Sequence, residues 1–98
     1  MSEFSVQITE RQNFIGIIQL RRSLSLGVKH KISYDEVCMI YNDEEMCFEQ
    51  FETNLIAYPG TQYFLVQVED INFELIDDWL VINYKSLLKE YSIKLIKI

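Results

Sequence analysis

Apolar residues recur with a period of two over long parts of this chain, and such alternation predicts half-buried β-strands. In the N-terminal third the large apolar residues stand mostly at even positions, namely Phe4, Val6, Ile8, Phe14, Ile18, Leu20, Leu24, Leu26, Val28 and Ile32. We predict strands at residues 3–9, 14–21 and 24–32. The polar run at residues 10–13 predicts the first turn.

A helix over residues 10–25 is the competing interpretation of the same segment. Ile17 and Leu24 also fit helical spacing, and Thr9 can cap such a helix. Gly16 stands inside the segment, however, and glycine weakens a helix interior. Together with the maintained parity, this glycine favours strands here.

The middle of the chain predicts a first β-hairpin. Residues 37–41 and 46–51 are apolar or aromatic runs, and a polar turn at residues 42–45 separates them. A helix that starts at Ser33 is the alternative, because Ser33 and Glu36 have the spacing of a capping box.

A second hairpin is predicted around Pro59-Gly60, since this dipeptide suits the centre of a type II turn. Residues 55–58 precede it, and a run rich in β-branched and aromatic residues follows at 63–68. Two further strands are indicated on either side of Asp77-Asp78, because apolar residues alternate before this polar pair and again after it.

The C-terminal part predicts a short helix over residues 84–91, which Asn83 can cap and whose apolar residues share one face. We therefore expect an α+β fold: a single antiparallel sheet of five to seven strands in a hairpin meander, with one or two short helices. At 98 residues, 49% of them hydrophobic, residues 1–98 suffice for one globular domain with a packed core.

The charges are distributed unevenly along the chain. Residues 32–84 hold twelve Asp/Glu and no Lys or Arg, whereas residues 1–31 and 85–98 together hold all nine Lys/Arg. Such a block creates a negative field over part of the surface unless basic strands lie beside it and form cross-strand pairs. Because the basic residues are few and divided between the two ends, we expect no direct nucleic-acid binding and no membrane binding.

An acidic surface with interspersed aromatic residues suits a basic protein partner. The residues that we expect to form it are Asp35, Glu36, Tyr41, Asp43, Glu44, Glu45, Glu49, Glu52, Asp77, Asp78 and Trp79. Other acids of the block, namely Glu69, Asp70 and Glu74, are secondary candidates.

Cys38 and Cys47 are the only cysteines, and His30 is the only histidine. Two cysteines are too few for a disulfide-rich secreted domain and lack zinc-knuckle spacing, so we expect two free thiols, no metal site and a cytoplasmic protein. One disulfide across the hairpin is the alternative. A catalytic Cys–His pair would need His30 beside Cys38, and nothing in the local sequence supports it.

These observations predict a protein without cofactor or catalytic machinery that binds another protein. The most concrete hypothesis is an inhibitor of a basic enzyme, such as a bacterial immunity protein that neutralises a nuclease toxin. A homo-oligomeric subunit that associates through an edge strand at residues 93–98 is the alternative. A small metal- or ligand-binding enzyme is the third hypothesis.

Overall fold

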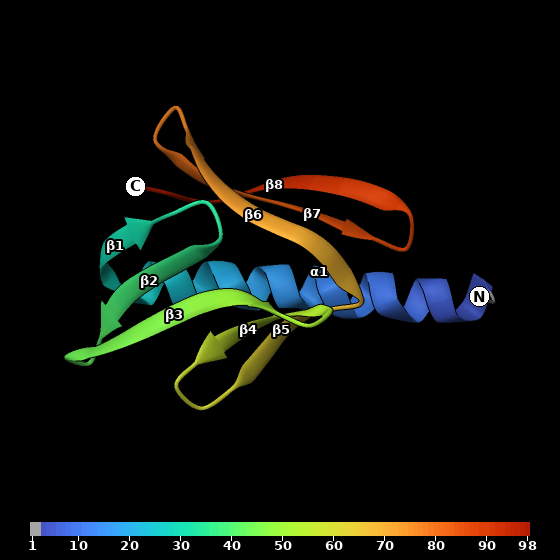
Figure 1. Cartoon of the computed structure of the whole chain (residues 1–98), viewed down its shortest axis with the longest axis horizontal. Helices are drawn as coiled ribbons and strands as arrows, with labels where there is room; N and C mark the ends of the chain where they lie inside the picture. The colour runs from blue at the N-terminus through green and yellow to red at the C-terminus, as the bar shows by residue number, and fades with distance from the viewer. Residues whose placement is uncertain (1–2) are drawn as a thin grey trace.

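One helix and eight strands make up residues 3–98, the part of the chain that the computed structural model describes; side chains are described from Ile8 onward (Figure 1). The elements are α1 (Glu3–Leu26), β1 (Val28–Ile32), β2 (Glu36–Tyr41), β3 (Glu44–Phe51), β4 (Asn54–Tyr58), β5 (Gln62–Val66), β6 (Val68–Ile76), β7 (Trp79–Ser86) and β8 (Lys89–Lys97). Strands β1–β5 form a five-stranded antiparallel sheet in sequential order, and β6–β8 form a three-stranded one. Within residues 3–98, no helix has the length and apolar character that crossing a membrane requires.

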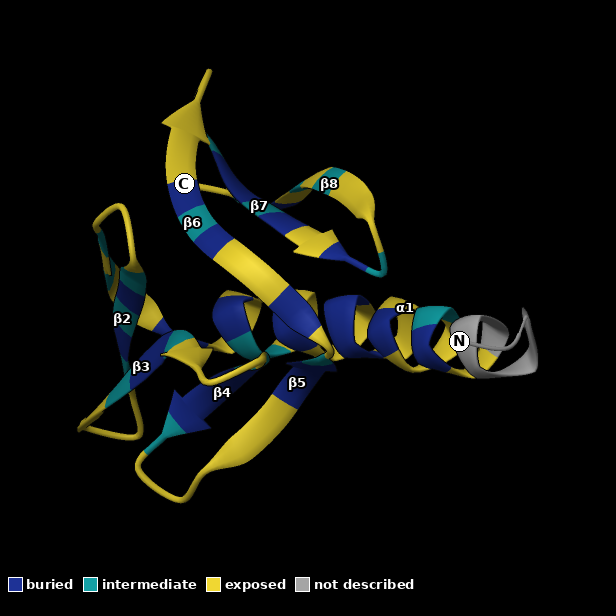
Figure 2. Cartoon of the chain, turned by 45° about the vertical axis from the view of Figure 1, so that its right-hand side comes forward, coloured by how far each residue is buried: buried dark blue, intermediate teal, exposed yellow. Residues whose placement is uncertain are grey.

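Both sheets and the helix share one hydrophobic core. Helix α1 contributes Ile17, Leu20 and Leu24 from a single stripe, and it packs mainly against β5 and also against β8. The sheets contribute large buried side chains such as Phe48 and Leu65 from the first and Phe73, Leu80 and Ile82 from the second. The buried residues of the helix and of both sheets belong to one cluster, and Figure 2 marks in dark blue where they lie along each element.

The predicted N-terminal strands at residues 3–9 and 14–21 are wrong: the chain is helical from Glu3 to Leu26, and the competing helix over residues 10–25 is correct. The predicted strand at 24–32 forms only over Val28–Ile32, as β1. The apolar residues at even positions lie on two different faces of helix α1. Leu20 and Leu24 are fully buried, whereas Phe14 is 68% exposed and Ile18 is also exposed. Apolar residues on both sides of a helix blur its period, and here they imitate the alternation of a strand.

Gly16 has a different role from the one the sequence suggested. It lies where the backbone of β5 comes against the helix, and a Cβ atom at this position would collide with the carbonyl oxygen of Phe64. The helix therefore tolerates the glycine because its close packing on the strand requires one.

Asn13, one turn before Gly16, fastens the helix to the edge of the five-stranded sheet. Its side-chain amide donates to the carbonyl oxygen of Val66 at 2.9 Å and accepts from the Val66 N–H at 2.9 Å. The amide thus replaces the hydrogen bonds of a neighbouring strand, and it satisfies the N–H and C=O of Val66 at the end of β5.

The structure has a turn at each of the three predicted places, but the first comprises only Asn42 and Asp43 instead of residues 42–45. Asn42 and Asp43, with φ of 52° and 64°, join β2 to β3, and Asp77 and Asp78 join β6 to β7 in the same left-handed conformation. Gly60 with φ of 97° lies in the turn between β4 and β5. Asn and Asp tolerate positive φ, which explains why these hairpins could be predicted. The alternative helix at Ser33 does not form.

The predicted single sheet and the predicted C-terminal helix are both wrong. The chain leaves the first sheet after Val66 and enters the second at Val68, with only Gln67, at φ of 53°, between them. Residues 84–91 form the end of β7, a turn at Leu87-Leu88 and the start of β8. Leucine is unusual at the positive φ of a tight turn, so Leu87-Leu88 gave no indication of a turn. Their spacing with the neighbouring apolar residues indicated a helix instead.

We expect Gly16→Ala to lower the free energy of unfolding by about 1–3 kcal/mol, although alanine favours helices, because the added methyl group overlaps the backbone of β5. Urea unfolding followed by circular dichroism measures the change. Gln12→Ala, on the exposed side of the same helix, is the control and should be neutral. Equal or greater stability of the glycine variant would contradict the close packing of α1 on β5.

The turn at Leu87-Leu88 predicts a stabilising double substitution. Both residues have positive φ, at 52° and 70°, and Leu88 is fully exposed. Leu87→Asn with Leu88→Gly should raise the free energy of unfolding by about 1–2 kcal/mol, because Asn-Gly adopts this turn without the steric cost of leucine. The reciprocal change Asn42→Leu in the β2–β3 turn should destabilise. A stability loss in the double variant would show that the leucines contribute contacts that outweigh the turn.

Candidate functional site

The five-stranded sheet has an outer face that turns away from the core. Val37, Met39 and Phe48 belong to the core, so their neighbours in β2 and β3 point to the opposite side. The strand registers place on this face Lys31 from β1, Glu36, Cys38 and Ile40 from β2, Glu45, Cys47, Glu49 and Phe51 from β3, Ile56 and Tyr58 from β4, and Tyr63 from β5. We call this set the outer face.

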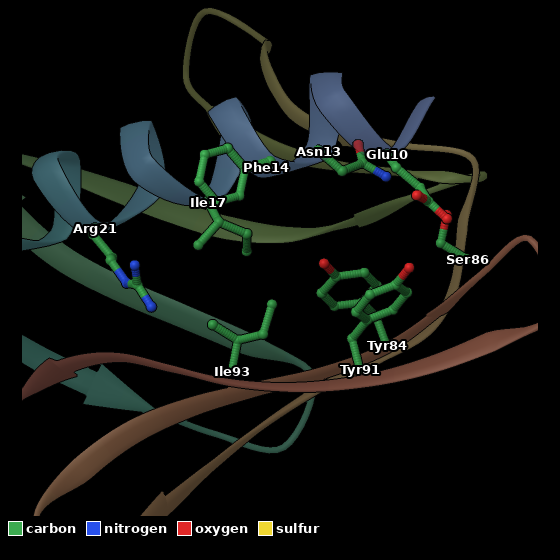
Figure 3. Close-up of a pocket in the computed structure, with 9 residues that line it drawn as sticks. All are labelled: Glu10, Asn13, Phe14, Ile17, Arg21, Tyr84, Ser86, Tyr91 and Ile93. Atoms are coloured by element: carbon green, nitrogen blue, oxygen red, sulfur yellow. The ribbon is translucent and has the colours of Figure 1, made fainter. Parts of the chain in front are cut away.

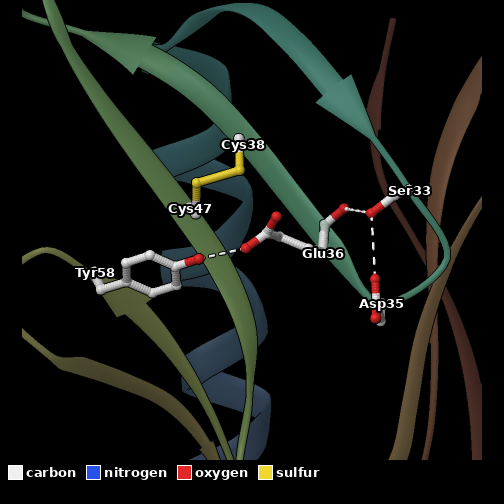
Figure 4. Close-up of a disulfide and its surroundings, with 6 residues drawn as sticks. All are labelled: Ser33, Asp35, Glu36, Cys38, Cys47 and Tyr58. Carbon is white, nitrogen blue, oxygen red and sulfur yellow. Dashed lines mark hydrogen bonds between the residues drawn. A yellow bond between two sulfur atoms is a disulfide. The ribbon is translucent and has the colours of Figure 1, made fainter.

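Carboxylates and a tyrosine meet at the centre of the outer face. Glu36 lies directly opposite Glu49 in the β2–β3 pair, and the hydroxyl of Tyr58 on β4 donates a hydrogen bond to the Glu36 carboxylate (Figure 4). This hydrogen bond, then burial, then the negative charges of Glu49, Glu36 and Glu45 raise the pKa of Tyr58 to about 12. The phenol therefore stays protonated and remains a donor to Glu36 at any physiological pH.

Glu49 is held in an unfavourable environment for a charge. Partial burial raises its pKa above the ordinary value, and the charge of Glu36, a hydrogen bond with Glu36 and the charge of Asp35 raise it further. Three acidic side chains thus compete for the same small region. Like charges opposite one another in a sheet destabilise it, so this arrangement lowers the stability of the fold.

The acidic block is not neutralised by salt bridges in the described part of the chain. The salt bridges there join Lys85 to Asp70 at 3.7 Å and to Glu90 at 3.8 Å, and Lys89 to Glu10 at 3.0 Å. Among the twelve acids of residues 32–84, only Asp70 has such a partner within the described residues. The predicted alternative, in which basic strands cancel the acidic ones by cross-strand pairs, therefore does not describe the five-stranded sheet.

The structure brings together only some of the residues predicted from the sequence. Glu36, Glu45 and Glu49 share the outer face, with Asp35 next to Glu36 just before β2. The other predicted residues of the first sheet lie at its ends: Tyr41, Asp43 and Glu44 around the β2–β3 turn and Glu52 at the β3–β4 turn.

The remaining predicted residues belong to the other sheet. Asp77 and Asp78 form the β6–β7 turn, and Trp79 begins β7 under the ammonium group of Lys94, which lies 5.4 Å from the ring centroid. They are therefore not part of the outer face. Three aromatic residues of this face, Tyr58, Phe51 and Tyr63, were not among the residues predicted for the acidic surface, although strand alternation in the two hairpins points to them.

Cys38 and Cys47 form a disulfide on the outer face, so the prediction of two free thiols is wrong and the cross-hairpin alternative is correct (Figure 4). The register places the two residues directly opposite each other, with their Cα atoms 4.0 Å apart. Neither belongs to the core cluster, although Cys47 is buried by its neighbours on the outer face. His30 makes no pair with Cys38, because its Nε2–H donates to the carbonyl oxygen of Leu24 at 2.8 Å and caps α1.

A pocket of about 360 Å³ lies between α1 and strands β7 and β8 (Figure 3). Tyr84 and Tyr91 stack at its floor with ring centroids 5.0 Å apart, and burial, then the charge of Tyr91, raises the pKa of Tyr84 to about 12. The other polar groups that line it already serve the fold: Asn13 binds Val66, Ser86 binds Gln67, Arg21 binds Lys94 and Glu10 binds Lys89. We therefore interpret the pocket as a gap in the packing of α1 on β7 and β8, not as a functional site.

Comparison with known proteins identified no relative of this chain. No protein family, curated protein or solved structure matches the chain. The contacts and charges of the outer face therefore have to carry the functional interpretation.

We expect the stability of the disulfide-bonded protein to fall as pH rises through the titration of Glu49. Its pKa is raised in the folded state, so the folded protein binds more protons than the unfolded chain over that range, and stability is lost as they dissociate. Glu49→Gln should remove this slope and raise stability at neutral pH. Urea unfolding at a series of pH values measures it, with Glu74→Gln on β6 as control. A steeper fall in the Glu49 variant would contradict the repulsion on the outer face.

Proposed function

We propose that this chain is an acidic protein-binding module that binds a basic protein through the outer face of its five-stranded sheet. The observation that carries the proposal is the set of Glu36, Glu45 and Glu49 around Tyr58, none of which forms a salt bridge with a described Lys or Arg. Repulsion among these groups costs stability. A cationic partner would neutralise this repulsion. The carboxylates would then favour binding, although they oppose folding.

The composition of the sheet supports the same proposal. Residues 28–66 hold seven Asp/Glu against two Lys, so this sheet presents a net negative surface. Such a field accelerates encounter with a basic protein and excludes acidic ones. On the outer face, Phe51 and Tyr63 are 50% and 53% exposed, and large aromatic side chains of this kind anchor interfaces when a partner buries them.

The most concrete form of the proposal is an inhibitor that neutralises a basic enzyme, such as a bacterial immunity protein directed at a nuclease toxin. Carboxylates of the outer face would occupy the cationic groups with which such an enzyme holds phosphate. We place the protein in the cytoplasm as part of this proposal. There the Cys38–Cys47 bond would be reversible, because disulfides in cytosolic proteins are usually transient.

The homo-oligomer hypothesis gains less support. Strand β8, which contains most of residues 93–98, is an edge of the three-stranded sheet, as that hypothesis requires. It carries Lys89, Lys94 and Lys97, however, and lysines on an edge strand discourage pairing with a second copy.

The test begins with capture of the tagged protein from its source cells at low salt, followed by purification of the retained basic protein. The combined Glu36→Gln, Glu45→Gln and Glu49→Gln variant should then associate with that protein at least about tenfold more slowly, with a weaker dependence on salt. Stopped-flow fluorescence at several salt concentrations, with a chelator present, measures the rate constants.

The control is Asp77→Asn with Asp78→Asn, which removes two charges from the β6–β7 turn on the other sheet. It should change the association rate much less than the outer-face variant. Equal loss in both variants would show that only the overall charge matters, and an unchanged rate in the outer-face variant would refute the proposed surface. Thermal unfolding of each variant checks that the fold is retained.

A further inference from the structure

Three metal-binding side chains converge at the centre of the outer face. A carboxylate oxygen of Glu36 and the sulfur atoms of Cys38 and Cys47 all lie within 4.8 Å of one another. Glu36 and Cys38 project from β2 and Cys47 from β3, so the register of one hairpin fixes all three (Figure 4). The two sulfur atoms are joined in the disulfide, and reduction of that bond would turn them into two thiols beside a carboxylate.

We propose that the reduced protein binds one zinc ion through Cys38, Cys47 and Glu36. Thiolate sulfur and carboxylate oxygen are common zinc ligands, at about 2.3 Å and about 2.0–2.2 Å. In a tetrahedral site these lengths place the donor atoms roughly 3.3–3.8 Å apart. Separation of the two sulfur atoms and a small approach by Glu36 therefore need only side-chain rotation, since the backbone already holds the three residues in place.

The acidic side chains beside the site favour a cation, although one lysine of the outer face, Lys31, lies opposite Cys38 in the β1–β2 pair. Glu49 faces Glu36 across the strand pair, and no described Lys or Arg forms a salt bridge with either. A bound zinc ion would provide the missing positive charge. Glu49 is not part of the group of ligand atoms within 4.8 Å of one another, so a water molecule would take the fourth position.

Groups around the proposed ligands hold Glu36 in position. The Tyr58 hydroxyl donates to its carboxylate, and the Ser33 hydroxyl donates to its carbonyl oxygen at 2.9 Å and so fixes the start of β2. Hydrogen bonds of this second layer orient the ligands of metal sites and raise their affinity. The Tyr58 bond therefore restricts the orientation of the Glu36 carboxylate.

The step that opens the site is a two-electron reduction. A dithiol or phosphine reductant gives two electrons to the Cys38–Cys47 bond and is itself oxidised, and the two sulfur atoms take up two protons. Zinc then displaces these protons as it binds the thiolates. In the opposite direction a small-molecule disulfide accepts two electrons from the thiolates and is reduced to two thiols, while the Cys38–Cys47 bond re-forms and the ion is released.

Reduction should leave the hairpin in place. Six residue pairs from Glu36↔Glu49 to Tyr41↔Glu44 connect β2 and β3, and the cysteines lie outside the core cluster. The site is therefore prepared by the fold and does not depend on the disulfide for its geometry. This inference also does not depend on the proposed basic partner.

Titration of the protein with zinc against a chromophoric chelator tests the proposal, after reduction with a phosphine under anaerobic conditions. We expect one zinc ion per reduced chain, and at least about 100-fold weaker binding by the oxidised protein, which lacks thiolate ligands. Cobalt, used as a spectroscopic substitute, should show sulfur-to-metal charge-transfer absorption in the reduced protein alone.

Two variants distinguish a site formed by all three side chains from metal binding by the two thiols alone. Cys38→Ser should abolish the charge-transfer signal of a two-thiolate site, and Glu36→Gln should weaken zinc binding about 10–100-fold while both thiols remain. Glu74→Gln on β6 is the matched control and should bind as the wild type does. The Glu36 variant keeps the disulfide, so it can be folded in the oxidised form before reduction.

Two results would overturn the proposal. One is zinc binding by the reduced wild type that is no tighter than that of the Cys38→Ser variant. The other is undiminished affinity in the Glu36→Gln variant, which would remove the carboxylate from the site. Amide spectra of the reduced, metal-free protein report whether the hairpin persists, and loss of its signals would equally contradict a site prepared by the fold.

Discussion

The contact between α1 and β5 is the constraint on which the rest of the structure depends. Gly16 allows the strand backbone to approach the helix, and Asn13 satisfies the backbone groups of Val66 at the strand's end. The buried stripe of α1 thus packs on the five-stranded sheet, and the three-stranded sheet completes the shared core. Because the helix covers the inner side, the opposite side of the five-stranded sheet is left without a covering layer within residues 3–98.

This arrangement divides the residues of each strand between two tasks. In β2 and β3 the inward residues Val37, Met39 and Phe48 supply the core, and stability is concentrated there. The outward residues are free to carry charge, yet the opposition of Glu36 and Glu49 goes beyond what solubility requires and costs stability. Features that oppose folding and have no structural compensation are the ones expected where a protein binds something.

The sequence predicted the hairpins well, because Asn42-Asp43, Pro59-Gly60 and Asp77-Asp78 are residues whose chemistry suits a turn. It failed for α1, where exposed Phe14 and Ile18 obscured the helical period, and at Leu87-Leu88, where the turn lacks turn-forming residues. The site was half predictable. The disulfide was only an alternative, because two cysteines are too few for a disulfide-rich secreted domain. The predicted four-residue turn at 42–45 would also have placed Cys38 opposite Glu49, whereas the two-residue turn places it opposite Cys47.

The proposed zinc site and the proposed partner surface share Glu36 but use different properties of the outer face. Zinc carries two positive charges and displaces two thiol protons, so its binding leaves the net charge of the face unchanged. The long-range field that steers a basic partner depends on that net charge and would persist. The close contacts would change, because Glu36 would be withdrawn as a ligand and the sulfur atoms would be covered by the metal. Zinc binding would therefore change the rate at which the partner dissociates more than the rate at which it associates.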